Sequence, residues 1–394
     1  MGYDKAKQGE DGIMKYYFRA EAMSVGYHKK LLIENIQIEL KRGEILTLIG
    51  PNGAGKSTVL KSIAKQLALI GGTVYLNDKS MEEMSGTEVS QKMAVVLTEK
   101  LRTEMMTCEE VIATGRYPYT GRFGILSDLD RKIVKEAMEL VHVTGIQDED
   151  FTRISDGQRQ RVMLARAICQ EPEIIILDEP TSYLDVKYKL EFLSILQDMR
   201  KKKGLTVIMS LHELELAARV SDKILCINGK CVERFGTPEE IFEQGYISRL
   251  FSIHTGSFDE ENGSMELKPA EGEAEVFIIA GGGCGRNIYR RLQRQGIPFV
   301  TGILQANDLD YPVAKVLAKE VIVAEAFEPI TDSQIEEALE KIKKCNKVIC
   351  CKEKFGTLEL ANQKLLEFAK QCGKEIESYN LLQGKERYEK QWQK

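Results

Sequence analysis

The sequence has no hydrophobic run long enough to cross a bilayer, no CxxC pair and no excess of basic residues. A formal net charge of -5 argues against nucleic acid as the main partner, because binding to the phosphate backbone normally needs a surplus of Lys and Arg. The N-terminus is charged and lacks the apolar core of a signal peptide. We therefore expect a soluble, intracellular protein.

Nine cysteines, an odd number, fit a reducing compartment better than a framework of disulfides. Cys350 and Cys351 are adjacent in an apolar, strand-like run, which favours two buried small side chains over a metal site. With 394 residues and 43% hydrophobic content, the chain can bury a large core and is expected to hold two domains.

Short β-rich segments alternate with helical patterns in the first two thirds of the chain. We expect strands at residues 16–25, 33–40, 44–49, 73–76, 94–97, 174–177 and 206–210, and helices at 130–142 and 186–200. This alternation predicts a mainly parallel sheet with helices packed on it. Asn228-Gly229 predicts a hairpin, and Thr237-Pro238 predicts a capped helix start.

Residues 255–273 are rich in Gly, Ser, Glu and Asp, which predicts a linker. The expected organisation is a flexible N-terminal tail at 1–15, a first domain at 16–254, the linker, and a second domain with a C-terminal tail at 274–394.

One glycine-rich segment stands between a strand-like and a helix-like stretch and fits the pattern GxxxxGK[ST]. Its glycines let backbone N–H groups point at phosphate oxygens, Lys56 can reach the terminal phosphates, and the Ser57 hydroxyl can join the coordination of Mg²⁺. A chance glycine turn is the alternative, and the strand and helix context disfavours it. The predicted nucleotide-binding residues here are Gly50, Pro51, Asn52, Gly53, Ala54, Gly55, Lys56, Ser57 and Thr58.

Four further segments follow in order: Ser155-Asp156-Gly157-Gln158, Asp178-Glu179 after an apolar strand, Ser182-Tyr183-Leu184-Asp185, and Leu211-His212-Glu213. Together with the glycine-rich segment, they resemble the ATP-binding cassette of ABC transporters over about residues 16–253. The resemblance implies an α/β fold, the P-loop NTPase of ABC type, with a helical subdomain at about 99–155. It also implies ATPase activity with ATP and Mg²⁺ as cofactors.

The resemblance assigns roles to individual residues. Asp178 would hold Mg²⁺ through its water shell, and Glu179 would polarise the attacking water as general base. His212 resembles the switch histidine that contacts the γ-phosphate, although a lone histidine is more often an ordinary surface or core residue. Tyr27 stands where the family has its adenine-stacking aromatic, with an ordinary strand-end tyrosine as the alternative.

Ser155, Gly157 and Gln158 resemble the signature motif, which in this family meets the γ-phosphate of ATP held on the other subunit. A chain with one phosphate cradle and one signature must therefore pair with a second. The resemblance implies a head-to-tail homodimer with two composite sites, and it places Asp185 near the interface, where it would couple them.

Two departures from the family pattern stand out. The signature has Asp156 where glycine is commonest, and a negative charge there would repel a triphosphate unless the side chain points away. The strand at 94–97 is not followed by the usual Pro-Gln pair. Thr98 aligns with the missing glutamine, which links Mg²⁺ and the attacking water to the membrane partner, so Thr98 and Glu99 are the candidate substitutes.

The segment Gly115-Arg116-Tyr117-Pro118 resembles importers of iron-siderophore, haem and cobalamin type, and a helix end broken by proline is the alternative. This branch implies integral membrane permease subunits as partners, a substrate-binding protein reached through the permease, and a cytoplasmic position on the inner face of the membrane. The second hypothesis is a soluble ABC ATPase acting on DNA or ribosomes. Neither the heptad coiled coils nor the second cassette of those proteins is present.

The last third of the chain repeats a strand–helix rhythm around Gly281-Gly282-Gly283-Cys284-Gly285. Strand-like runs at 276–280, 299–304, 321–323 and 347–350, with a helix at 287–294, predict a small Rossmann-like α/β domain whose first turn could present N–H groups to a phosphate. The GxGxxG fingerprint is incomplete, and no acidic residue clearly ends the second strand, although Asp308 lies shortly beyond it. Small-ligand sensing and a structural or dimerising role both stay open.

Overall fold

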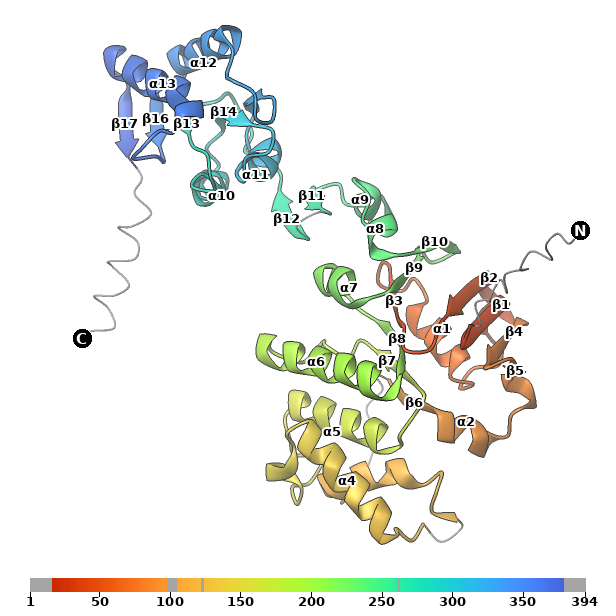
Figure 1. Cartoon of the computed structure of the whole chain (residues 1–394). Helices are drawn as coiled ribbons and strands as arrows, with labels where there is room; N and C mark the ends of the chain where they lie inside the picture. Colours follow the sequence, from red (N-terminus) through yellow and green to blue (C-terminus); the bar gives the residue numbers. More distant parts are fainter. Residues whose placement is uncertain (1–15, 98–104, 122–123, 261–262, 379–394) are drawn as a thin grey trace, which may run out of the picture. The chain divides into compact units, whose positions relative to one another are not determined.

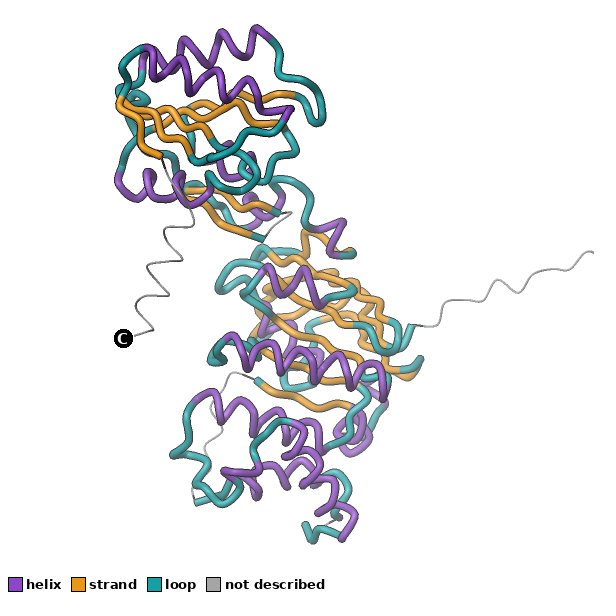
Figure 2. Tube along the Cα trace, turned by 60° about the vertical axis from the view of Figure 1, so that its left-hand side comes forward, coloured by secondary structure: helices purple, strands orange, loops and turns teal. Residues whose placement is uncertain are grey.

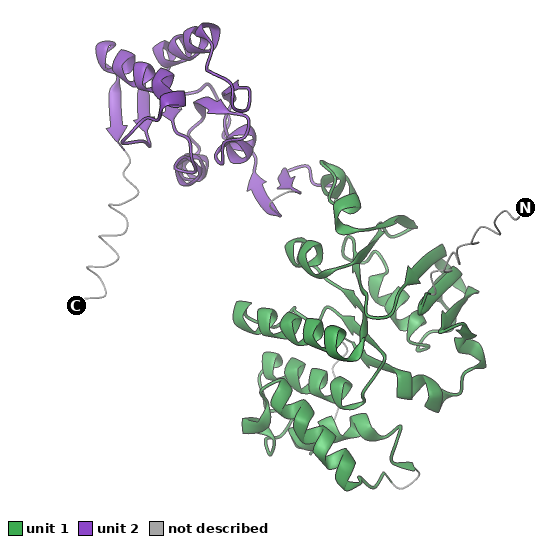
Figure 3. Cartoon of the chain, viewed as in Figure 1, with its two compact units in different colours: residues 1–251 green, residues 252–394 purple. Residues whose placement is uncertain are grey.

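The computed structural model describes residues 16–97, 105–121, 124–260 and 263–378. The chain divides into two compact units, Met1–Phe251 and Ser252–Lys394 (Figure 3). None of the helices in these described parts is long and apolar enough to span a membrane.

A six-stranded sheet forms the centre of the first unit, in the order β10-β9-β3-β8-β7-β6. All neighbours are parallel except β10, which returns from β9 as the hairpin predicted at Asn228-Gly229. Residues of β3, β7 and β8 are buried along their whole length, as expected for parallel strands covered on both faces. The strands are β3 (Ile45–Ile49), β6 (Met93–Val96), β7 (Ile174–Asp178), β8 (Thr206–Ser210), β9 (Lys223–Ile227) and β10 (Val232–Gly236).

The strands predicted at 16–25, 33–40 and 73–76 exist, but they form a separate antiparallel sheet. Its order is β2 (Lys30–Leu40), β1 (Phe18–Tyr27), β4 (Gly71–Leu76) and β5 (Lys79–Ser80). Buried and exposed residues alternate along much of β2, which is typical of a sheet with one solvated face. Helix α1 (Lys56–Ile63) packs Val59, Leu60 and Ile63 into a core shared with residues of both sheets.

Helices surround the parallel sheet of the first unit (Figure 2). Helix α5 packs on α3 and α4 as part of a helical layer beyond β6 (Figure 1). The helices predicted at 130–142 and 186–200 are confirmed within a few residues, and the predicted cap at Thr237 begins α8. The α-helices are α2 (Gly86–Lys92), α3 (Cys108–Ala113), α4 (Asp128–Leu140), α5 (Asp156–Cys169), α6 (Val186–Lys203), α7 (Leu214–Val220), α8 (Pro238–Ile241) and α9 (Tyr246–Leu250). Short 3₁₀ turns are η1 (Met81–Glu83), η2 (Thr114–Arg116) and η4 (Thr144–Ile146).

The second unit is a parallel α/β structure in the strand order β15-β14-β13-β16-β17. Helices α10 and α11 cover one face and α12 and α13 the other (Figure 1). Cys350 and Cys351 are buried beside this sheet. The strands are β13 (Val276–Ile279), β14 (Phe299–Gln305), β15 (Glu320–Ala324), β16 (Lys347–Cys350) and β17 (Glu375–Ser378). The helices are α10 (Arg286–Gln295), α11 (Tyr311–Leu317), α12 (Asp332–Lys344), the 3₁₀ turn η5 (Thr357–Glu359) and α13 (Leu360–Gln371).

The stretch at 255–273, predicted as a linker, contains an antiparallel hairpin. Strand β11 (Gly256–Asp259) pairs with β12 (Ser264–Leu267), and Glu266 of β12 forms an ion pair with Arg290 of α10. This hairpin therefore packs as part of the second unit.

Candidate functional site

The glycine-rich loop after β3 is shaped by backbone positions that only glycine fills easily. A Cβ at Gly50 would lie 2.0 Å from the carbonyl oxygen of Ile227 in β9, so the two backbones touch there. Gly53 and Gly55 have φ angles of 78° and 99°, in the left-handed region where a side chain is strained. These glycines allow the chain to turn tightly from the buried strand into α1.

Lys56 opens α1 and is buried, with 5% of its surface exposed. Its Nζ donates to the carbonyl oxygens of Gly50 at 2.7 Å and Pro51 at 3.1 Å. Burial lowers the pKa of Lys56, and the carboxylates of Glu179 and Asp178 act in the opposite direction. The ammonium group therefore lies inside the loop, within electrostatic reach of both acids.

The two acids stand at the carboxyl end of β7 and are held by the neighbouring strand. The Ser210 hydroxyl, at the end of β8, donates to Asp178 Oδ1 at 2.7 Å and accepts the N–H of Glu179 at 2.9 Å. Sequence reasoning missed Ser210, although its place directly before Leu211-His212 was a usable signal. Since Asp178 is buried, this hydrogen bond fixes one of its carboxylate oxygens.

Glu179 and His212 form a contact pair at the surface of this edge. His212 Nε2 lies 2.5 Å from Glu179 Oε1, and both side chains are partly exposed. Glu179 has a φ of 51°, which is uncommon for a residue with a side chain and costs roughly 1–3 kcal/mol. Such strain persists only where surrounding contacts hold it, and the bond to Ser210 is one of them.

The carboxyl ends of β3, β7 and β8 thus bring four of the predicted residues together: Lys56, Asp178, Glu179 and His212. Hydroxyl and carboxylate oxygens are the ligands that Mg²⁺ prefers, so Ser57 and Asp178 fit its donor set. Thr58 Oγ1 donates to the hydroxyl of Tyr27 at 3.2 Å. Tyr27 is the last residue of β1, where 45% of its surface is exposed and its ring is accessible for stacking.

The signature segment is an N-terminal capping box on α5. Ser155 Oγ accepts the N–H of Gln158 at 3.2 Å, and the Ser155 N–H donates to Gln158 Oε1 at 2.9 Å. Asp156 forms an ion pair with Arg159 one turn along the helix. The charge of Asp156 is therefore partly compensated by its own helix, and this weakens the electrostatic objection to Asp156 in the signature.

Asp185 caps the next helix, because its Oδ1 accepts the N–H of Tyr188 at 3.0 Å at the start of α6. A Cβ at Gly157 would approach the carbonyl oxygen of Tyr183 to 3.3 Å, so the start of α5 lies against the segment before α6. Thr98 and Glu99 lie outside the residues that the structure describes.

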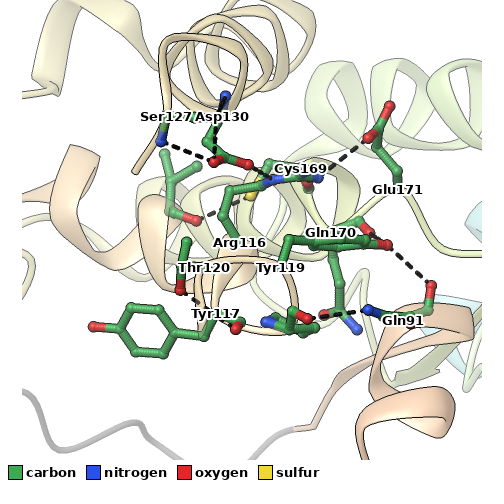
Figure 4. Close-up of polar contacts among 12 residues, drawn as sticks. Gln91, Arg116, Tyr117, Tyr119, Thr120, Ser127, Asp130, Cys169, Gln170 and Glu171 are labelled. Carbon is green, nitrogen blue, oxygen red and sulfur yellow. Dashed lines mark hydrogen bonds and ion pairs between the residues drawn. The ribbon is translucent and has the colours of Figure 1, made fainter. Parts of the chain in front are cut away.

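The Gly-Arg-Tyr-Pro segment is an anchor between helices (Figure 4). The Arg116 side chain is 4% exposed and donates to Asp130 Oδ1 at 2.8 Å and to the carbonyl oxygen of Cys169 at 2.6 Å. Its third partner is Glu171 Oε2 at 3.2 Å. Hydrogen bonds from Ser127 and Arg116 lower the pKa of Asp130, so this buried carboxylate is charged at neutral pH.

Tyr119 extends the same anchor toward the parallel sheet. The Arg116 guanidinium lies 4.2 Å from the centre of its ring. The Tyr119 hydroxyl lies 3.0 Å from the carbonyl oxygen of Gln170 and 3.2 Å from that of Gln91, just before β6 (Figure 4). The segment therefore joins α4, the end of α5 and the approach to β6.

Comparison with known proteins agrees with this geometry. Residues 33–182 match the family model described as ABC transporter, and residues 299–393 match the MJ0874 family. An uncharacterized ABC transporter ATP-binding protein of Methanocaldococcus jannaschii is 41% identical over 288 residues, which are 73% of this chain and 99% of that protein. The chain belongs to the ATP-binding proteins of ABC transporters.

Other matches agree with this family. The iron(3+)-hydroxamate import ATP-binding protein FhuC of Bacillus subtilis is 36% identical over 233 residues, covering 59% of this chain and 87% of that protein. A solved ATP-binding subunit of an ABC transporter superimposes with a TM-score of 0.52 at 26% identity, covering 58% of this chain and 94% of that one. The predicted ABC ATPase is confirmed.

Proposed function

We propose that this ABC ATPase powers import of a metal chelate of iron-siderophore, haem or cobalamin type through a membrane permease. The convergence of Lys56, Asp178, Glu179 and His212 at one sheet edge is the observation that carries the ATPase assignment. The similarity to an iron(3+)-hydroxamate importer and the Gly-Arg-Tyr-Pro segment support the substrate class.

The residues at the carboxyl ends of β3, β7 and β8 have separate roles in binding ATP. Backbone N–H groups of the glycine-rich loop bind the phosphates, and Lys56 exchanges the carbonyl oxygens of Gly50 and Pro51 for phosphate oxygens. Ser57 and Asp178 would hold Mg²⁺, which supplies positive charge to the β- and γ-phosphates. Tyr27 stacks on the adenine.

Hydrolysis needs a base beside the attacking water and a group that senses the γ-phosphate. Glu179 accepts the proton of the water, since its carboxylate lies at the end of β7 next to Asp178. His212, already bound to Glu179, holds this carboxylate in place and contacts the γ-phosphate. Loss of the γ-phosphate then releases both side chains.

The second half of each site comes from another copy of the chain. Ser155, Gly157 and Gln158 at the start of α5 present a hydroxyl and backbone N–H groups to the γ-phosphate bound by the partner. Asp185 lies near this interface and couples the two sites. ATP binding closes the homodimer, hydrolysis opens it, and a permease on the cytoplasmic face of the membrane converts the cycle into import from a substrate-binding protein.

Reconstitution tests this proposal. The chain would be purified with a candidate permease, inserted into liposomes with the substrate-binding protein, and supplied with ferric hydroxamate, haem or cobalamin. We expect ATP-dependent uptake of one of these chelates, and none with the Glu179→Gln chain. Failure to associate with any permease, together with ribosome or DNA binding that survives moderate salt, would instead support the soluble ABC ATPase.

A further inference from the structure

The carboxyl edge of the second sheet has the topology of a ligand site. Strand β13 lies at the centre, and the chain continues to β14 and β15 on one side before it returns to β16 and β17 on the other. The loops that leave β13 and β16 therefore diverge at this edge. In open parallel sheets, ligands bind in the crevice at such a switch point.

Three N–H groups of the glycine-rich loop after β13 are bonded to carboxylates of the chain. The N–H of Gly282 donates to Asp308 Oδ2 at 2.9 Å, and those of Gly285 and Arg286 donate to Asp310 at 2.9 and 3.1 Å. Asp310 is completely buried. Two carboxylates of the chain itself thus accept three N–H groups of this loop, and a phosphate at the predicted turn would have to replace them.

A pocket of about 410 Å³ is lined by one of these carboxylates, that of Asp308. Its volume lies in the range of small-molecule sites, and its walls combine apolar and polar groups as such sites do. The end of β14 and the turn η5, which leads into α13, supply most of the wall. Its apolar side chains are Ile303, Ile330 and Leu358, and its polar ones include Gln305, Asp308 and Glu359.

Two of the residues that line this pocket, Asp308 and Glu359, carry charge and lie near Lys352. A Cβ on Gly281 would lie 3.1 Å from both Asp308 Oδ2 and Glu359 Oε1 and 3.3 Å from Lys352 Nζ. Lys352 pairs with Glu359, so two carboxylates face one ammonium group and the balance is negative. A carboxylate has about four acceptor positions, and backbone N–H groups and Lys352 use only part of this capacity.

We propose that this pocket binds a small organic cation, an amine or guanidine. Its charged group bonds to Asp308 and Glu359, and its apolar part lies against Ile303, Ile330 and Leu358. Anionic ligands are disfavoured by the same carboxylates. The site is independent of the ATPase machinery of the first unit and makes the second unit a ligand-binding module.

Saturation-transfer NMR on the full chain without nucleotide tests the proposal. The probes are tyramine, agmatine and spermidine, with tyrosol as the uncharged analogue of tyramine. At least one amine should bind, and tyramine should bind more tightly than tyrosol by about tenfold, the value of one charge-assisted hydrogen bond. If none of the three amines binds better than tyrosol, the proposal is overturned.

Variants distinguish amine binding in the pocket from amine binding to exposed acids elsewhere on the surface. Asp308→Asn with Glu359→Gln should weaken amine binding at least about tenfold, because both charged acceptors are lost. The matched double variant Glu336→Gln with Glu337→Gln changes two exposed acids of α12 by the same charge and should have no effect. Leu358→Trp enlarges an exposed side chain of the pocket wall, so it should also block binding.

The alternative outcome is that the pocket binds a nucleotide. In a Lys56→Ala chain, whose cassette is impaired, ATP should not displace the amine, and amine binding should be unchanged. Binding that persists in Leu358→Trp, or ATP that competes with the amine in Lys56→Ala, would contradict the assignment. Neither result depends on whether the first unit transports a metal chelate.

Discussion

At the scale of single residues, Lys56 lies where the glycine-rich loop after β3 is proposed to bind phosphate. Its buried ammonium group satisfies two carbonyl oxygens of its own loop and can transfer those bonds to a ligand. We expect Lys56→Ala to weaken ATP binding by about 10- to 150-fold, the value of a hydrogen bond to a charged group. Titration with fluorescent ATP measures the change, and Lys201→Ala, an exposed site on α6, is the control. Unchanged affinity in Lys56→Ala would remove the lysine from the site.

Glu179 is the proposed general base for ATP hydrolysis. Glu179→Gln keeps the shape of the side chain and removes the base, so ATPase activity should fall by about 10²- to 10⁴-fold while ATP affinity is kept. Phosphate release and nucleotide binding, measured on the same preparation, separate the two effects. Normal turnover in this variant would refute the role.

Thr98 aligns with the family's glutamine and Glu99 follows it, and the substitutions Thr98→Ala and Glu99→Ala distinguish these two candidate substitutes. The residue that replaces glutamine should uncouple ATPase activity from transport when truncated, because it links the nucleotide to the membrane partner. Uptake per ATP hydrolysed in liposomes is the measurement. If neither change alters this ratio, the coupling does not pass through either side chain.

At the scale of elements, the buried Arg116 links α4 to the end of α5. Arg116→Met leaves the carboxylate of Asp130 buried without its partner, which should lower the free energy of unfolding by about 3–5 kcal/mol. Arg153→Met removes an exposed pair with Asp150 and should cost less than about 1 kcal/mol. Urea unfolding of both variants provides the comparison. Equal losses would mean that Arg116 is not the anchor of this layer.

The elements also show where sequence reasoning ends. Strands and helices of the first unit followed from hydrophobic period and turn residues, since these are local signals. The split into two sheets did not, because the pairing of β1 with β4 is a long-range choice. The hydrogen-bond partners of Arg116 come from positions 130, 169 and 171. The sequence therefore showed the resemblance of the Gly-Arg-Tyr-Pro segment to a family, but not its role in joining helices.

The same limit applied to the candidate sites. Lys56 was predictable from the pattern of the glycine-rich loop, and Asp178, Glu179 and His212 from the resemblance of their segments to the motifs of the family. Ser210 carries no motif, and its role depends on the register of β8 against β7. In the second unit, the bonds from the loop N–H groups to Asp308 and Asp310 join residues about 25 positions apart, so the local glycine pattern could not predict them.

At the scale of the whole molecule, the proposed mechanism requires two copies of the chain to bind ATP at their interface. Light scattering after size exclusion of the Glu179→Gln chain tests this most directly. The control is the Glu179→Gln chain with Ser155→Arg added. It should still bind ATP, but the arginine blocks the contact between the signature segment and the γ-phosphate bound by the partner. With ATP and Mg²⁺, the Glu179→Gln chain should elute at twice its monomer mass, and the chain that also carries Ser155→Arg should stay monomeric. A Glu179→Gln chain that binds ATP and nevertheless remains monomeric would contradict the account.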